Sequence, residues 1–239
     1  MVPELERLIQ AHQNIVFFGG AGVSTESGIP DFRSVDGLYH QKFKYPPETM
    51  LSHTFYEQHT AEFFDFYRQK LIVHGAKPNA AHLRLAKLER EGKLKAVVTQ
   101  NIDGLHQAAG SKTVYELHGS TLRNYCTRCG KFFPVQFIED AAGVGDGVPR
   151  CTECGGIVKP DVVLYEEPLD EDVMARALHY IRQADVLLIG GTSLAVYPAA
   201  GLITYYRGHK LAVVNKGGAG PAQAAVTVDG PIGQVLEQL

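Results

Sequence analysis

The 239-residue chain is 45% hydrophobic, which excludes an intrinsically disordered protein and is enough for a packed core. Its net charge of -3 gives no sign of the basic surface that nucleic acids need, so we expect no direct nucleic-acid binding. The first residues, Met1–Glu6, are acidic and lack the basic region of a signal peptide, so we expect a cytoplasmic protein.

The chain begins with an amphipathic pattern over residues 3–12, which predicts a helix, and continues with an apolar run at 15–18, which predicts a buried strand. The next segment, residues 19–34, is rich in glycine and other small residues. A strand that enters a glycine-rich turn and then a helix N-terminus is typical of a phosphate-binding loop. An ordinary tight turn is the alternative.

Residues 35–60 predict an irregular segment of the kind that often forms a functional loop or lid. Strands and helices then alternate. We expect helices at 61–73, 79–92, 170–183 and near 198–207. We expect strands at 95–99, 114–117, 162–165, 186–189 and 210–214. The uncharged run 186–206 is as long as a membrane span. Its glycines and proline favour a strand, a loop and a helix, so we expect no membrane segment.

This alternation predicts an α/β protein with a Rossmann-like, doubly wound parallel sheet, together with a smaller zinc-binding domain and a helical insert. In such sheets the ligand binds outside the carboxyl ends of the strands. Polar segments follow the predicted strands at that edge, at 20–33, 100–106, 118–120, 191–193 and Asn215. The sequence therefore predicts one site formed by all of them.

Four cysteines form two Cys-x-x-Cys pairs separated by 21 residues, namely Cys126, Cys129, Cys151 and Cys154. This spacing is typical of a tetrahedral zinc site, and a disulfide pair or a redox motif is the alternative. Four protein ligands leave no open coordination position, so we expect the zinc to be structural.

The glycine-rich loop does not match an ordinary dehydrogenase. Gly20 and Gly22 have no third glycine at the fingerprint position, and no second strand follows directly. The better hypothesis is non-redox chemistry on a dinucleotide, with His118 as a general base near neutral pH. A purely structural role is the alternative for this histidine. Arg33 could pair with a diphosphate, and Asn101 and Asp103 could bind a carboxamide or orient a water.

The motifs at 20–24, 28–33, 99–106, 116–119, 159–163 and 191–194, with the four cysteines, occur in an order that resembles the sirtuins, the NAD-dependent protein lysine deacylases. The resemblance extends from about residue 8 to residue 230. It implies a Rossmann-like NAD-binding domain of residues 1–34, 76–120 and 159–239. Residues 35–75 would be the cofactor-binding loop and the helical part of a small domain, and 121–158 its zinc-binding module.

The resemblance also implies NAD as co-substrate, structural Zn2+, and a monomer that binds an acetyl-lysine protein or peptide by strand addition. The implied catalytic residues are His118 and Asn101. The implied cofactor-binding residues are Gly20, Ala21, Gly22, Ser24, Asp31, Phe32, Arg33, Gln100, Asn101, Ile102, Asp103, Gly191, Thr192, Ser193 and Asn215. The implied substrate-binding residues are Phe32, Ile102, Val162, Val163 and Leu194.

The implied reaction moves the acetyl group from lysine to ADP-ribose and releases nicotinamide and O-acetyl-ADP-ribose. Members that prefer acidic acyl groups carry Tyr-x-x-Arg in the helix after the long loop. Here Asp65 stands three residues before Arg68, so we expect acetyl rather than succinyl or malonyl groups. Other or longer acyl groups, protein mono-ADP-ribosyl transfer, and an NAD-binding zinc regulator without turnover are the alternatives.

Overall fold

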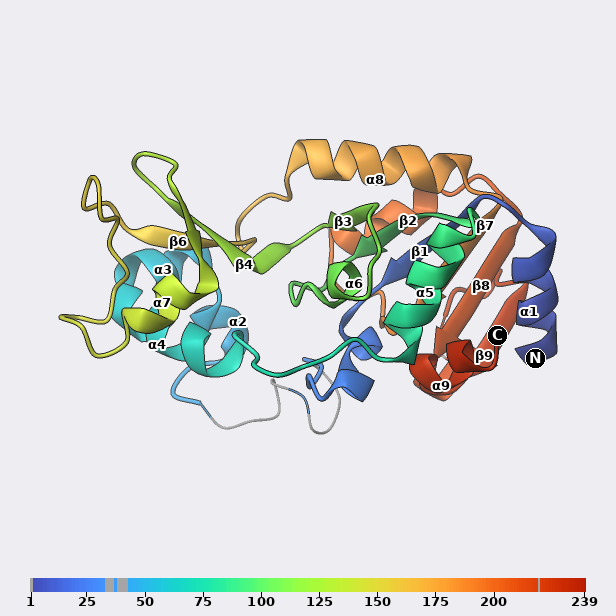
Figure 1. Ribbon diagram of the computed structural model, residues 1–239, viewed down its shortest axis with the longest axis horizontal. Helices are drawn as coiled ribbons and strands as arrows, with labels where there is room; N and C mark the ends of the chain where they lie inside the picture. The colour runs from blue at the N-terminus through green and yellow to red at the C-terminus, as the bar shows by residue number, and fades with distance from the viewer. Residues whose placement is uncertain (1, 33–36, 38–42, 219) are drawn as a thin grey trace.

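The computed structural model describes residues 2–32, 37, 43–218 and 220–239, and it forms a large and a small domain side by side (Figure 1). The first and last helices, α1 (Val2–Ala11) and α9 (Ile232–Glu237), both lie on the large domain, away from the small one. Arg33, a predicted cofactor-binding residue, lies outside the described residues.

In the large domain, the described residues form a six-stranded sheet in the order β3-β2-β1-β7-β8-β9, and every pairing in it is parallel. The strands are β1 (Ile15–Gly19), β2 (Leu94–Thr99), β3 (Val114–Glu116), β7 (Val186–Gly190), β8 (Lys210–Asn215) and β9 (Val226–Asp229). The strand order reverses between β1 and β7. A parallel sheet binds its ligand in the crevice at such a switch point.

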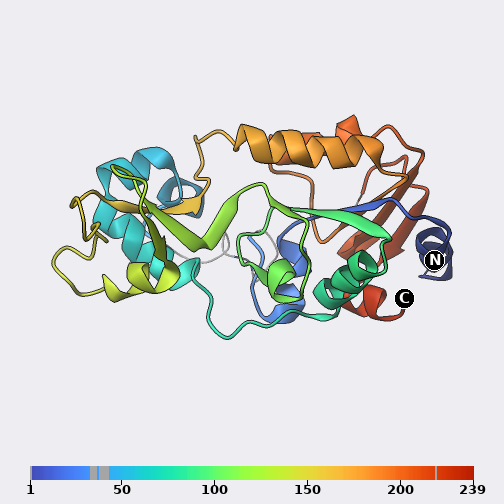
Figure 2. The same ribbon diagram turned by 45° about the horizontal axis from the view of Figure 1, so that its top comes forward.

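Helices cover both faces of this sheet, because alternate residues of each strand point to opposite sides. Phe17 of β1 packs with α1, α5 (Ala80–Arg90) and α9 on one face. Phe18 packs on the other face with α8 (Glu171–Gln183) and the 3-10 helix Ala199–Tyr205. Figure 2 shows α8 in orange and α5 in green on opposite sides of the sheet. Burial on both faces explains why the strands read as continuous apolar runs.

The small domain joins a three-stranded sheet, in the order β5-β4-β6, to short helices. Its strands are the antiparallel β4 (Gly119–Cys126), β5 (Phe132–Pro134) and β6 (Val158–Val162). Its helices are α2 (Pro47–Met50), α3 (His53–Gln58), α4 (Thr60–Lys70) and α7 (Val135–Asp140). Buried aromatic rings, such as Phe63, Phe64 and Tyr67, fill its core.

The predicted fold class is confirmed, and most predicted elements are present within one or two residues. Three local expectations are wrong. The strand expected at 162–165 lies at 158–162, because these residues pair with β4 in the small sheet. The helix near 198–207 is a 3-10 helix. The segment 35–60, expected to be irregular, contains α2 and α3.

No helix in the described ranges is long and apolar enough to cross a membrane. The uncharged run 186–206 instead forms β7, a loop and the short 3-10 helix. The last elements of the large domain, β9 and α9, were not predicted from the sequence.

Two buried histidines meet beside the sheet. His82 of α5 and His106 of α6 (Leu105–Ala108) have ring centroids 4.7 Å apart. Burial lowers the pKa of His82 to about 4, and burial together with the neighbouring His82 imidazole lowers the pKa of His106 to about 3. Both rings are therefore neutral in the folded protein near pH 7.

These histidines predict a loss of stability in mild acid. In the unfolded chain, His106 binds a proton as the pH falls below about 6.5, whereas in the folded protein it stays neutral to a lower pH. The free energy of unfolding is therefore unaffected by His106 above about pH 6.5 and decreases as the pH falls below that value. At about pH 5 the decrease in the free energy of unfolding that His106 alone causes is about 2 kcal/mol. Urea unfolding of His106→Phe at a series of pH values should show a weaker acid dependence than wild type. An unchanged slope would contradict this account.

Candidate active site

The loop after β1 lies against the loop after β7, backbone to backbone. Gly22 N donates to Gly191 O at 2.8 Å. A Cβ on Gly22 would lie 2.8 Å from that same oxygen, and a Cβ on Gly191, whose φ is +59°, would collide with Val23. Glycine at both positions therefore lets the loops at the switch point touch.

The structure differs from the expected phosphate-binding loop in one respect. The expected helix N-terminus is replaced by two 3-10 turns, Ala21–Val23 and Thr25–Ser27. Tight contact between the two loops leaves no room for a long helix to start at Ala21. The main chain instead curls around Ser24, which is 1% exposed.

A polar cluster joins this loop to the segment after β2. Ser24 Oγ donates to Asp103 Oδ2 at 2.7 Å, and Asn101 Nδ2 donates to Ser24 Oγ at 3.1 Å. Asn101 is 8% exposed. An amide and a carboxylate held side by side offer both a donor and an acceptor, which is what recognition of a carboxamide requires.

Two threonines that sequence reasoning missed fix the shape of this segment. Thr99 Oγ1 accepts a hydrogen bond from Asn101 N at 3.0 Å. Thr121 donates to Ile102 O from both its main-chain N, at 3.0 Å, and its Oγ1, at 3.1 Å. A hydroxyl two residues before a turn amide is a recognisable pattern, so Thr99 could have been found. No local signal links Thr121 to Ile102.

His118 lies at the end of β3, where the chain passes into β4 and the small domain. Its Nδ1 is 3.0 Å from the carbonyl oxygen of Gln100. Because a carbonyl oxygen only accepts, Nδ1 carries the proton and Nε2 is left as an acceptor. Gly119, at a φ of +74°, packs so tightly on Asp161 O that no Cβ fits there.

Burial lowers the pKa of His118 below its usual value of 6.5, while the hydrogen bond with Gln100 acts in the opposite direction. The imidazole is therefore neutral at neutral pH. Geometry and charge together make His118 suitable as a general base through Nε2.

A second polar group forms at the ends of β7 and β8. Asn215 Oδ1 accepts from Thr192 N at 3.1 Å, and its Nδ2 donates to Thr192 O at 2.9 Å. Gln100 Nε2 donates to Thr192 Oγ1 at 3.1 Å, which ties this group to the His118 segment. A cavity of about 300 Å³ lies beside it, lined in part by Thr192, Ser193 and Leu194.

The predicted substrate-binding residues belong to the cores on the two sides of the domain junction. Phe32 and Ile102 pack against the small-domain core, which includes Val162. Val163 and Leu194 pack against the large-domain core beneath α8. Asp31, next to Phe32, is half-buried.

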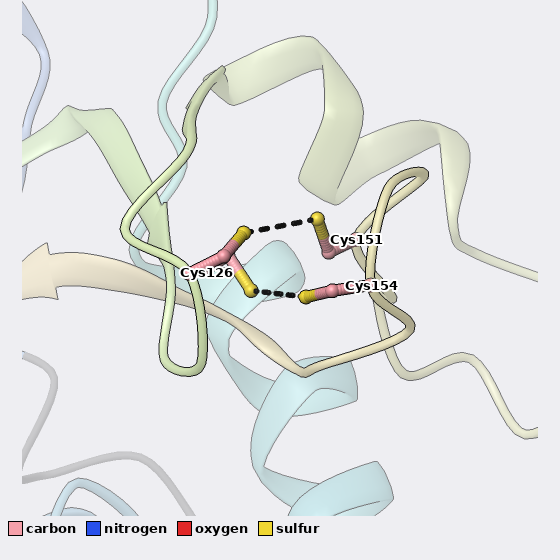
Figure 3. A group of neighbouring side chains, drawn as sticks. Cys126, Cys151 and Cys154 are labelled. Carbon is pink, nitrogen blue, oxygen red and sulfur yellow. Dashed lines mark hydrogen bonds between the residues drawn. The ribbon is translucent and has the colours of Figure 1, made fainter.

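The four cysteines converge in the small domain, and Figure 3 shows three of them. All four Sγ atoms lie within 4.8 Å of one another. The Cys126–Cys154 and Cys129–Cys151 sulfur pairs are 3.4 Å and 3.7 Å apart, too far for disulfides. A tetrahedron of Zn–S bonds of about 2.3 Å places its sulfurs about 3.8 Å apart, so these residues fit zinc.

Arg68 and Asp65 do not act as expected from the acyl motif. The Arg68 guanidinium donates to Ile138 O at 3.2 Å and to Gly147 O at 2.9 Å, which ties α4 to the zinc-binding module. Asp65 is exposed. The expected repulsion of an acidic acyl group by Asp65 therefore finds no support in its position.

Comparison with known proteins agrees with this site. The model of the Sir2 family matches residues 20–198. The NAD-dependent protein deacetylase of Clostridium acetobutylicum is 58% identical over 99% of this chain and 96% of its own length. That of Cutibacterium acnes is 52% identical over 93% of this chain and 90% of its own length.

Solved structures agree as well. One of Sir2 with a p53 peptide and NAD+ covers 100% of this chain and 96% of its own, with 37% identity and a TM-score of 0.88. Another structure of Sir2, with a deacetylated p53 peptide and 3'-O-acetyl-ADP-ribose, covers 99% of this chain and 96% of its own, with 36% identity and a TM-score of 0.90. The chain therefore belongs to the Sir2 family of NAD-dependent protein deacetylases, the sirtuins.

Proposed function

We propose that this chain removes acetyl groups from protein lysine side chains with His118 as the base. The observation that carries this proposal is the hydrogen bond between His118 Nδ1 and Gln100 O, which leaves Nε2 ready to accept a proton. His118 lies one residue from β4, at the junction where the two domains meet.

NAD fits the residues gathered at the switch point, and it supplies the ribose that receives the acetyl group and the nicotinamide that leaves. In the proposal, the main chain of Gly20, Ala21, Gly22 and Gly191 holds the diphosphate. Ile102 and Asp103 hold the carboxamide, with Ser24 bonded to Asp103, and Gln100 and Asn101 lie by the nicotinamide ribose. Thr192, Ser193 and Asn215 hold the adenosine ribose, while Asp31, Phe32 and Arg33 cover the reacting end.

Each catalytic side chain has a defined task. Neutral His118 removes a proton from a ribose hydroxyl, and because burial lowers its pKa it stays unprotonated at neutral pH. Asn101, fixed by Thr99 and Ser24, orients a water or the ribose. Phe32 and Ile102 exclude bulk water from the acyl group, which strengthens the polar contacts around it.

The substrate peptide, in this proposal, adds a strand between the segment near Val163 and residues 191–194. Within the described part of the chain, the Val163 carbonyl accepts no hydrogen bond, so it is free to accept the N–H of the acyl-lysine amide. The main chain of Tyr165 is engaged on both sides, since Tyr165 N donates to Leu51 O and its own carbonyl accepts from His53 N. A solved structure of Sir2 bound to an acetylated peptide covers 100% of this chain, which supports binding of an acetylated peptide here.

We also propose a cytoplasmic monomer that does not bind nucleic acid directly. Four reduced cysteines arranged for a metal favour a reducing compartment. The net charge of -3 provides no attraction for phosphate backbones. We also propose domain boundaries at 34–35, 75–76, 120–121 and 158–159. Strand β6, which follows the last of these boundaries, pairs with β4 in the small sheet.

His118→Ala should lower peptide deacetylation by about 100-fold or more, the range expected for loss of a general base. Nicotinamide release from NAD, measured with and without an acetyl-lysine peptide, is the assay. In wild type the rate should hold from about pH 8 to about pH 6.5 and fall only below that, because the pKa of His118 is lowered. His179→Ala, an exposed histidine of α8, is the matched control and should keep full activity. Full activity in His118→Ala, or release that does not depend on peptide, would rule out this mechanism.

Zinc removal should unfold the small domain before it affects anything else, because the four thiolates hold its sheet and loops together. We expect a metal assay to find zinc in the purified protein. A strong chelator should abolish deacetylation together with the near-ultraviolet signal of the aromatic core. Retention of both after complete loss of zinc would contradict a structural role.

The acyl group is expected to be acetyl, because the guanidinium of Arg68 is already bound to two main-chain carbonyls. Acetyl and succinyl peptides should be compared with wild type and with Arg68→Gln. The variant should lose about 1–3 kcal/mol of stability, since it loses hydrogen bonds from a charged donor, while the acetyl-to-succinyl ratio stays the same. A selective loss of succinyl turnover in Arg68→Gln would show that Arg68 reads the acyl group.

A further inference from the structure

One residue outside the predicted site touches the loop after β1 from a different element. Asn79 is the N-cap of α5, where its Oδ1 accepts from Ala81 N at 2.9 Å. Its Nδ2 donates to Val23 O at 2.8 Å and to Ser27 Oγ at 3.0 Å. A single amide therefore starts a helix and holds the loop.

The two contacts from Nδ2 lie on either side of Ser24. Val23 precedes Ser24, and Ser27 N donates to Ser24 O at 2.9 Å. Ser24 is in turn the residue that carries the bonds to Asn101 and Asp103. Any shift of the Val23–Ser27 segment would therefore move Ser24 away from both partners.

A second chain of contacts returns from Asn79 to the same cluster. Asn79 N donates to His82 Nδ1 at 3.2 Å, and the ring of His82 packs on that of His106. His106 belongs to α6, whose first amide, Leu105 N, donates to Asp103 Oδ1 at 2.9 Å. Asn79 thus supports Ser24 through the loop after β1, and it supports Asp103 through His82 and α6.

We propose that Asn79 is a positioning residue that holds the loop of residues 21–27 in the shape that binds NAD. The inference rests on the proposed function for the NAD site but goes beyond it, because Asn79 is not among the proposed cofactor-binding residues. Asparagine suits both tasks, since its side chain combines one acceptor with two donors. Serine or aspartate can cap the helix as well, but neither supplies those two donors.

This difference separates the two tasks by experiment. Asn79→Ser keeps a good N-cap, so its unfolding temperature should fall only by what the two lost bonds to the loop contribute. Its affinity for NAD, measured by calorimetry, and its KM for NAD should each weaken by about tenfold, since two hydrogen bonds to the loop are lost. The KM for the acetyl peptide should stay the same. Without NAD, the amides of residues 22–28 should exchange with solvent faster than in wild type.

The matched control is Asp170→Ala, which removes the N-cap of α8, where Asp170 Oδ1 accepts from Val173 N at 2.8 Å. This variant should lose stability and keep the wild-type affinity for NAD. Asn79→Asp is a second variant that keeps the cap, and it should weaken NAD binding as Asn79→Ser does. Wild-type NAD affinity and exchange in both Asn79 variants, or a loss of stability alone, would overturn the inference. If wild type itself releases no nicotinamide with peptide, the proposed deacetylation fails, and the exchange data still decide the role of Asn79.

Discussion

The close approach of two backbone loops at the centre of the sheet is the constraint on which the site depends. Gly22 N reaches Gly191 O because neither glycine carries a side chain. The contact lies where the strand order reverses, between β1 and β7, so it fixes the crevice of the sheet. Bulkier residues would push the loops apart and separate Ser24 from the groups that follow β7. The rest of the site is assembled around this contact.

The same edge of the sheet also leads into the second domain. The chain leaves β3 through His118 and Gly119 and enters β4, which continues to the first zinc-binding cysteine, Cys126 (Figure 1). Arg123 of β4 reinforces this passage, since it pairs with Glu116 of β3 at 2.7 Å and with Asp161 of β6 at 2.8 Å. Arg123 thus links the small sheet to the strand that leads into His118.

The sequence predicted the sheet, the metal cluster and most of the polar groups, because each depends on local patterns. Apolar runs marked strands, and Cys-x-x-Cys spacing marked the zinc ligands. It did not predict that Arg68 binds the carbonyls of Ile138 and Gly147, or that Asn79 holds the loop after β1. Those contacts join residues more than 50 positions apart, and nothing in their neighbours in sequence identifies the partner. The strand at 158–162 was misplaced for the same reason, since its pairing with β4 decides its ends.

The partner of His118 also shows how a histidine without a carboxylate beside it is suited to the proposed role of base. A neutral carbonyl, Gln100 O, fixes the tautomer, whereas an aspartate in its place would stabilise the protonated ring and raise its pKa. Burial acts in the other direction and lowers the pKa. The ring is thus held in place and kept neutral by the same surroundings. Because Gln100 also binds Thr192 through its side chain, His118 and Thr192 share one support.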